Sequence, residues 1–307
     1  KKLKDYLSST GIKKIICTYD KIDKLMEFIN PIEFKLMIDE YHNFLKQYSF
    51  RDKAINGVLA HFKEFKSYCF LSATPIPNNL KPAIFNDITE YMADWNTTDE
   101  ITVYPYHTNT PYMVAAKFIK TYQAKGCLNV NGIESKEAYF FINSVTEIKA
   151  ILKQTQLTED DYRIICADNP KNRKTLEGYT ISSSADAPKK FNFITSKSFE
   201  GVDFHSETGL CFVVSNVQNR HTLVSIDMDI PQIVGRIRTK SNPFRNKVVH
   251  IFNTKATDHY TTFEDMKLIV DEEVKAAQER ADMLNNAKLS EAAIKQQVNE
   301  IKKVGVE

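Results

Sequence analysis

The feature that most constrains this chain is a repeated alternation between short apolar runs and segments with helical periodicity. Most of the runs are rich in β-branched or aromatic residues, and most lead directly into polar side chains. They cover residues 13–18, 34–39, 68–71, 138–143, 162–167, 191–195, 210–215 and 247–253. Between several of them, apolar residues recur at intervals of three and four, which is typical of amphipathic helices. Helices are expected at about 112–124 and at 145–154, and residues 232–238 are expected to begin another. The alternation predicts an α/β fold with parallel sheets.

The length of 307 residues suits two domains. A stretch rich in Pro, Asn and Thr, from about residue 75 to 110, is expected to carry the chain from one domain to the next. We therefore expect a first domain at 1–105, a second doubly wound domain at 106–256 and a helical extension at 257–307. The extension has an apolar stripe that indicates a long helix packed on the body or on a protein partner.

Composition narrows the functional classes. A hydrophobic content of 42% and a charged content of 26% are typical of a soluble globular protein, and a net charge of only +2 means that any nucleic-acid groove must be local. No apolar stretch approaches the roughly 20 residues of a membrane span, so we expect no membrane contact and a cytoplasmic location. The five cysteines and seven histidines show no metal-ligand spacing.

The run at 34–39 ends in Asp39 and Glu40, with His42 two residues further on. Adjacent acids at the end of an apolar strand are costly to bury unless a cation or a proton transfer uses them. Strand ends in an open α/β sheet are also where ligands bind. The alternative interpretation of residues 39–42 by themselves is a solvated turn.

Three further segments follow the acids in a fixed order. They are Ser72-Ala73-Thr74-Pro75, the segment from Thr195-Ser196 to Gly201-Val202-Asp203, and Gln232-Ile233-Val234-Gly235-Arg236-Ile237-Arg238. Together with the acids they resemble motifs II, III, V and VI of the superfamily 2 helicases and translocases of the DExH kind. The resemblance implies two RecA-like domains of doubly wound parallel sheet, the first truncated on its N-terminal side, with ATP and Mg²⁺ between them.

The same resemblance implies roles for the residues of the first domain. Asp39 would act on Mg²⁺ through water, and Glu40 beside it would polarise the water that attacks ATP. His42 would link these acids to Ser72 and Thr74.

In the second domain, the resemblance places Gln232 and Arg236 at the phosphates and Gly201 and Asp203 at the nucleotide, with Asp203 near the ribose. Arg236 and Arg238 would supply the arginine finger, because a guanidinium keeps its charge and presents a planar fork to phosphate oxygens.

This chain departs from many DExH proteins at its second arginine. In those proteins the second arginine lies three residues after the first, whereas here that position is Thr239. The Gln-x-x-Gly-Arg-x-Arg form is similar to that of herpesvirus-type origin-binding helicases and related phage and plasmid proteins.

Small hydroxyl, amide and aromatic side chains at strand ends are the expected contacts to a single strand, since such groups hold phosphates without reading sequence. They come from motif V and from segments that resemble motifs IV and Ib. The residues are Thr18, Tyr19, Asn143, Ser144, Thr195 and Ser196. Helix capping is the alternative role for Thr18.

A motor of this class also needs a P-loop, whose glycines and lysine hold the phosphates. The 307 residues contain no Gly-Lys pair. We expect the P-loop to lie upstream of Lys1, and we expect these residues alone to hydrolyse ATP poorly or not at all.

Three functions stay open. The first is a helicase or translocase core that acts on single-stranded nucleic acid, with DNA expected. The second is a double-strand translocase of the restriction or remodelling type, and the third is a catalytically inactive nucleic-acid-binding scaffold.

Overall fold

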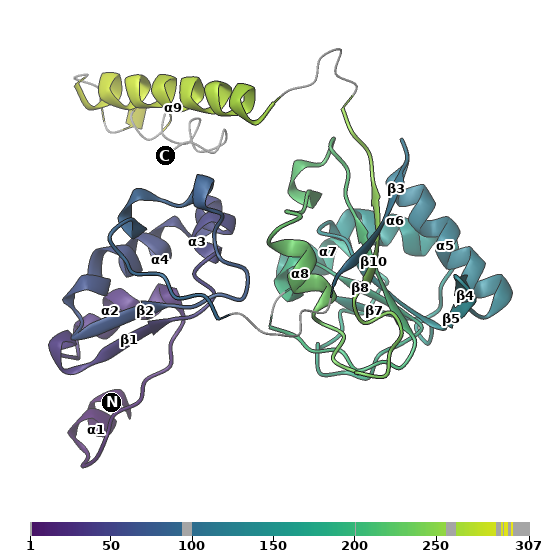
Figure 1. Cartoon of the computed structure of the whole chain (residues 1–307), viewed down its shortest axis with the longest axis horizontal. Helices are drawn as coiled ribbons and strands as arrows, with labels where there is room; N and C mark the ends of the chain where they lie inside the picture. Colours follow the sequence, from purple (N-terminus) through teal and green to yellow (C-terminus); the bar gives the residue numbers. More distant parts are fainter. Residues whose placement is uncertain are drawn as a thin grey trace. The chain divides into compact units, whose positions relative to one another are not determined.

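The computed structural model describes residues 2–93, 100–199, 201–255 and 262–286, together with 290, 292, 293 and 296. The chain divides into two compact units (Figure 1). The first comprises Lys1–Asn30, Lys46–Phe62 and Ala256–Glu307, and the second comprises Pro31–Leu45 and Lys63–Lys255.

The first unit is helical. Its helices are α1 (Lys2–Ser8), α2 (Ile22–Met26), α4 (Tyr48–His61) and α9 (Phe263–Asn286). α4 packs on α2, and Ile22, Ile55 and Val58 are buried. The predicted C-terminal helix is confirmed as far as Asn286, and its apolar residues Phe263 and Val274 are exposed.

The strand predicted at 13–18 is wrong. These residues form no regular element, and Ile16 is fully exposed. A β-branched run becomes a strand only where a neighbouring strand completes its hydrogen bonds and packs against its side chains.

A small sheet opens the second unit. β1 (Lys35–Ile38) lies parallel to β2 (Ser67–Phe70), with Met37 opposite Cys69. Ile38 is buried but Met37 is 67% exposed, so β1 is not the wholly buried strand that its apolar sequence predicts. The ring of Phe70, the last residue of β2, packs edge-on against the ring of Phe85 at 5.1 Å between centroids. α3 (Asn43–Lys46) follows β1.

The main sheet has six parallel strands in the order β3-β10-β9-β6-β8-β7. The strands are β3 (Thr102–His107), β6 (Glu137–Phe141), β7 (Tyr162–Ile165), β8 (Phe191–Ile194), β9 (Gly209–Val214) and β10 (Lys247–Phe252). The α/β prediction is confirmed in this form, with a six-stranded and a two-stranded parallel sheet. The main sheet begins at Thr102, so β3 spans the boundary expected at residue 105.

Both faces of the main sheet are covered, which explains why its central strands read as continuous apolar runs. α5 (Pro111–Lys125) and α6 (Val145–Thr155) cover one face, where Phe140 stacks on Phe212 at 4.7 Å between centroids. α8 (Asp229–Val234) covers the other face, where Ile233 packs with Tyr139. Figure 1 shows α5 and α8 on opposite sides of these strands.

Several short elements were not predicted from the sequence, among them two strands and a helix. β4 (Leu128–Val130) and β5 (Ile133–Ser135) form a hairpin, and α7 (Pro170–Thr175) follows β7. The hairpin turn is Asn131-Gly132, with φ of 53° and 85°, which is the pair of left-handed residues that a two-residue hairpin favours. No helix within the described ranges combines the length and apolar character that crossing a bilayer requires.

The end of α6 provides a test of the fold. Gln156 caps this helix at φ 54°, a left-handed conformation that glycine adopts without strain. Gln156→Gly is therefore expected to raise the free energy of unfolding by about 0.5–1 kcal/mol in urea denaturation. Gln154→Gly, inside the last turn, should lower it by a similar amount. Equal losses in both variants would contradict the observed helix end.

Candidate functional site

The two acids of the sequence motif follow β1 directly. Asp39 Oδ1 accepts a hydrogen bond from the Glu40 backbone N–H at 3.0 Å. Glu40 has φ 52°, a conformation that costs a non-glycine residue free energy and persists only where its surroundings fix it. The backbone on either side is held to β2, since Tyr41 N–H donates to Leu71 O at 3.1 Å.

A histidine joins these acids to the end of β2. His42 is fully buried, and its Nδ1 lies 3.3 Å from Glu40 Oε2 and 2.8 Å from Ser72 Oγ. Ser72 Oγ in turn accepts from Thr74 N–H at 3.0 Å. The ends of the two strands are thereby joined by polar contacts.

The same polar chain continues to α8 within the second unit. Gln232 is buried, and its Nε2 donates to Thr74 Oγ1 at 3.2 Å. Arg236 donates back to Gln232, from Nε to the carbonyl oxygen at 2.8 Å and from Nη2 to Oε1 at 3.1 Å. Residues that are distant in the sequence therefore form one hydrogen-bonded series.

This series can be tested by one substitution. Thr74→Val keeps the side-chain shape but removes the acceptor of the buried Gln232 amide, at a cost of about 1–2 kcal/mol in the free energy of unfolding. Thr74→Ser should retain most of the stability in the same urea denaturation. A valine variant as stable as the wild type would show that the hydrogen bond makes no net contribution.

The arginines do not lie in a helix, contrary to the prediction that 232–238 begins one. α8 ends at Val234, and Gly235 caps it. Beyond it, Phe204 N–H donates to Arg236 O at 2.8 Å and Arg238 N–H donates to Phe204 O at 2.9 Å. Because these backbone groups pair with Phe204, the segment leaves the helix and becomes extended.

The two arginines differ in exposure and share one acid. Arg236 is buried, whereas the side chain of Arg238 is 47% exposed. Asp203 Oδ1 accepts from Arg238 Nε at 2.8 Å and lies 3.9 Å from Arg236 Nη1. The hydrogen bond from Arg238 is the main cause that lowers the pKa of Asp203. Gly201, at φ 72°, makes the turn that leads to this acid.

A separate group of side chains gathers at the carboxyl edge of the main sheet, around a cavity of about 520 Å³. We call it the strand-end cavity. Four of its lining residues are nucleic-acid contacts expected from the sequence, and sequence reasoning did not select the others. The expected ones are Asn143, Ser144, Thr195 and Ser196, and the others include Lys171, Asn172, Lys197 and His221.

Within this cavity the expected residues have different surroundings. Asn143 ties three strand ends together, because its Nδ2 donates to His221 O at 2.6 Å and its Oδ1 accepts from Ser196 N–H at 3.2 Å. Ser144 caps α6. Thr195 is buried and donates to Ile165 O at 3.3 Å, while Ser196 is exposed.

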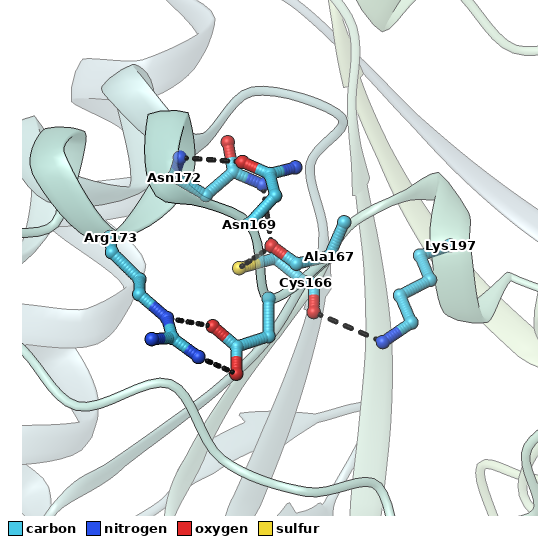
Figure 2. Close-up of polar contacts among 7 residues, drawn as sticks. Cys166, Ala167, Asn169, Asn172, Arg173 and Lys197 are labelled. Carbon is cyan, nitrogen blue, oxygen red and sulfur yellow. Dashed lines mark hydrogen bonds and ion pairs between the residues drawn. The ribbon is translucent and has the colours of Figure 1, made fainter.

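Two exposed lysines, against one acid, Glu147, give the cavity lining a net positive charge. Lys197 follows β8, and its Nζ lies 3.4 Å from Cys166 O at the end of β7 (Figure 2). Lys171 lies in α7, a helix that the Asn169 side chain caps through the N–H of Asn172 at 2.8 Å. The Asn169-Pro170 pair is the sequence signal that could have predicted this helix start.

The remaining expected contacts, Thr18 and Tyr19, belong to the first unit. The pKa of Asp20 is lowered to about 2, first by its hydrogen bond with Lys21 and then by one with Thr18. Tyr19 lies under the guanidinium of Arg51, at 5.5 Å from the ring centroid. Both residues thus take part in local contacts.

The donor set at Asp39 and Glu40 suits Mg²⁺ in a nucleotide complex. Such an ion keeps several waters and takes one or two protein carboxylates besides the phosphate oxygens. Across the described part of the chain, no group of three or more His, Cys, Asp or Glu is placed to hold a metal by itself.

No family model matches the chain, and no curated protein matches it.

Proposed function

We propose that this chain is the core of a superfamily 2 helicase or translocase that couples ATP hydrolysis to movement on single-stranded DNA. This function needs two sites, one for phosphoryl transfer and one that binds the single strand. The proposal includes a P-loop supplied from outside these 307 residues, which contain no Gly-Lys pair.

The strand-end cavity is the observation that carries the proposal. Asn143, Ser144, Thr195 and Ser196 were selected from two places in the sequence, and they line one cavity together with Lys171 and Lys197. Lysines, hydroxyls, amides and backbone N–H groups are the groups that hold phosphates without reading bases. A single strand lying along this edge would meet the exposed Ser196, Lys171 and Lys197.

The proposed phosphoryl-transfer site rests on the series of polar contacts that starts at Asp39 and ends at Arg236. Phosphoryl transfer needs a placed metal, an oriented water and cations for the developing charge. Asp39 would hold Mg²⁺ through water, Glu40 would orient the attacking water, and Arg238 would leave Asp203 for the γ-phosphate. The contacts among His42, Ser72, Thr74 and Gln232 would couple this site to the main sheet, where the strand-end cavity lies.

The test is ATP turnover by the full-length protein, with and without single-stranded DNA. Turnover that DNA stimulates supports a motor, and strand separation on a forked substrate then distinguishes a helicase from a double-strand translocase. A protein that binds DNA but shows no turnover with any nucleic acid is a binding scaffold, and the proposal fails.

A further inference from the structure

A second, smaller cavity lies beside the strand-end cavity at the outer edge of the main sheet. Its volume is about 290 Å³, and we call it the edge pocket. Ala167 lines the strand-end cavity and the next residue, Asp168, lines the edge pocket. α7 separates the two, with Lys171 facing the first and Arg173 facing the second. β7 is an edge strand, so the edge pocket is the next cavity along the row of strand ends.

The charges of the edge pocket differ from those of its neighbour. Two acids, Asp168 and Glu177, line it together with one cation, Arg173. Arg173 is already paired, since its Nε and Nη2 donate to the two oxygens of Asp168 at 2.5 and 2.8 Å (Figure 2). With one acid in excess, the pocket disfavours a phosphate and favours a neutral group that can donate N–H to a carboxylate.

The shape of the edge pocket favours a flat ring. Tyr179 lines it, and its ring is supported edge-on by Tyr162 at 5.9 Å between centroids. Leu176, which is buried, and Ile181 add apolar surface. The turn that presents Tyr179 is fixed by Gly178 at φ 87° and by the hydrogen bond from Tyr179 N–H to Leu176 O at 2.7 Å. The volume lies just below the roughly 300–1,000 Å³ of ligand pockets, which leaves room for one ring system.

We propose that the edge pocket receives one base of the single strand whose phosphates lie in the strand-end cavity, with Tyr179 stacking on it and Glu177 accepting its N–H groups. This inference rests on the proposed function, because it assumes that a strand follows the row of strand ends. It adds a fixed position for one base, and with it a means for the protein to keep register on a moving strand.

The test is binding of fluorescein-labelled DNA single strands to the full chain, measured by fluorescence anisotropy. Tyr179→Leu is expected to weaken binding roughly tenfold, in the range known for base stacking on aromatic side chains. Tyr179→Phe keeps the ring and should bind nearly as well as the wild type. Far-UV circular dichroism checks that each variant is folded. Glu177→Ala, which changes an exposed side chain, serves as a second variant, and Glu134→Ala is its control.

A scan of abasic sites along the strand locates the base. One abasic position should weaken binding by the wild type about as much as Tyr179→Leu does, and the same position should have little effect on the leucine variant. If every abasic strand binds the wild type equally, or if Tyr179→Phe is as weak as Tyr179→Leu, the base pocket is disproved while strand binding stands.

Two other outcomes overturn the inference. If a free mononucleotide competes for the edge pocket and the abasic scan is flat, the pocket binds a soluble nucleotide and not the strand, which overturns the inference. If the wild type binds no single strand at all, the proposed function fails together with it.

Discussion

ATP turnover in the full-length protein is expected to fall by about two to four orders of magnitude when Glu40 is replaced by glutamine. Glutamine keeps the size of the side chain, but it cannot accept a proton from the attacking water. Nucleotide binding should persist, because Asp39 would still hold Mg²⁺ through water. Phosphate release measures the first quantity, and titration with a fluorescent ATP analogue measures the second.

Glu134→Gln is the matched control for this substitution. Glu134 lies exposed on β5, so the same chemical change there should leave turnover as it is. If Glu40→Gln retained more than about a tenth of the wild-type turnover, Glu40 would not be acting as the base that orients and deprotonates water.

The second large effect is expected from removing both lysines of the strand-end cavity. Lys171→Ala combined with Lys197→Ala should weaken single-strand binding and make it less sensitive to salt. Each phosphate contact to a single strand contributes about −0.7 to the slope of log affinity against log salt concentration, so the slope should shrink in magnitude by about 1.4. Anisotropy titrations at several salt concentrations measure both quantities.

Lys117→Ala combined with Lys120→Ala provides the control. Both lysines are exposed on α5 and do not line the cavity. The two double variants carry the same net charge, so an equal change of slope in both would mean that general charge binds the DNA. In that case the strand-end cavity would have no special part in binding.

The main sheet was predictable because its strands are buried on both faces. Residues 138–142 and 210–214 are apolar throughout, and β6 and β9 each begin one residue before these runs. The helices between the strands carry clear intervals of three and four, and α5 and α6 agree with prediction to within a residue. Burial on both faces produces continuous apolar runs, which can be recognised in a single sequence.

The predictions were wrong where contacts between distant parts of the chain determine the local structure. Residues 13–18 have strand propensity but no neighbour in the described sheets, and Met37 shows that the small sheet leaves one face open. The helix expected at 232–238 ends early because Arg236 and Arg238 pair with the backbone of Phe204, a contact that no local pattern reveals. α7 is only six residues long, too short for periodicity to mark it.

The candidate site was predictable in its motif residues and not in its surroundings. Asp39, Gln232 and Thr195 stand out through the motifs they belong to. Lys171 and His221 carry no such signal, because only the fold brings α7 and the 3-10 turn at Arg220–Thr222 to the same cavity. The roles of all these residues stay predictions until activity is measured.

The central claim is that nucleic acid in the strand-end cavity drives ATP hydrolysis at Glu40. The most direct measurement is the ratio of ATP turnover with and without single-stranded DNA, in the full-length protein and in its Lys171→Ala, Lys197→Ala variant. We predict strong stimulation in the wild type, and a variant with the same basal turnover that needs much more DNA for half-maximal stimulation. Turnover that is absent, or that does not respond to DNA in either protein, would contradict the account.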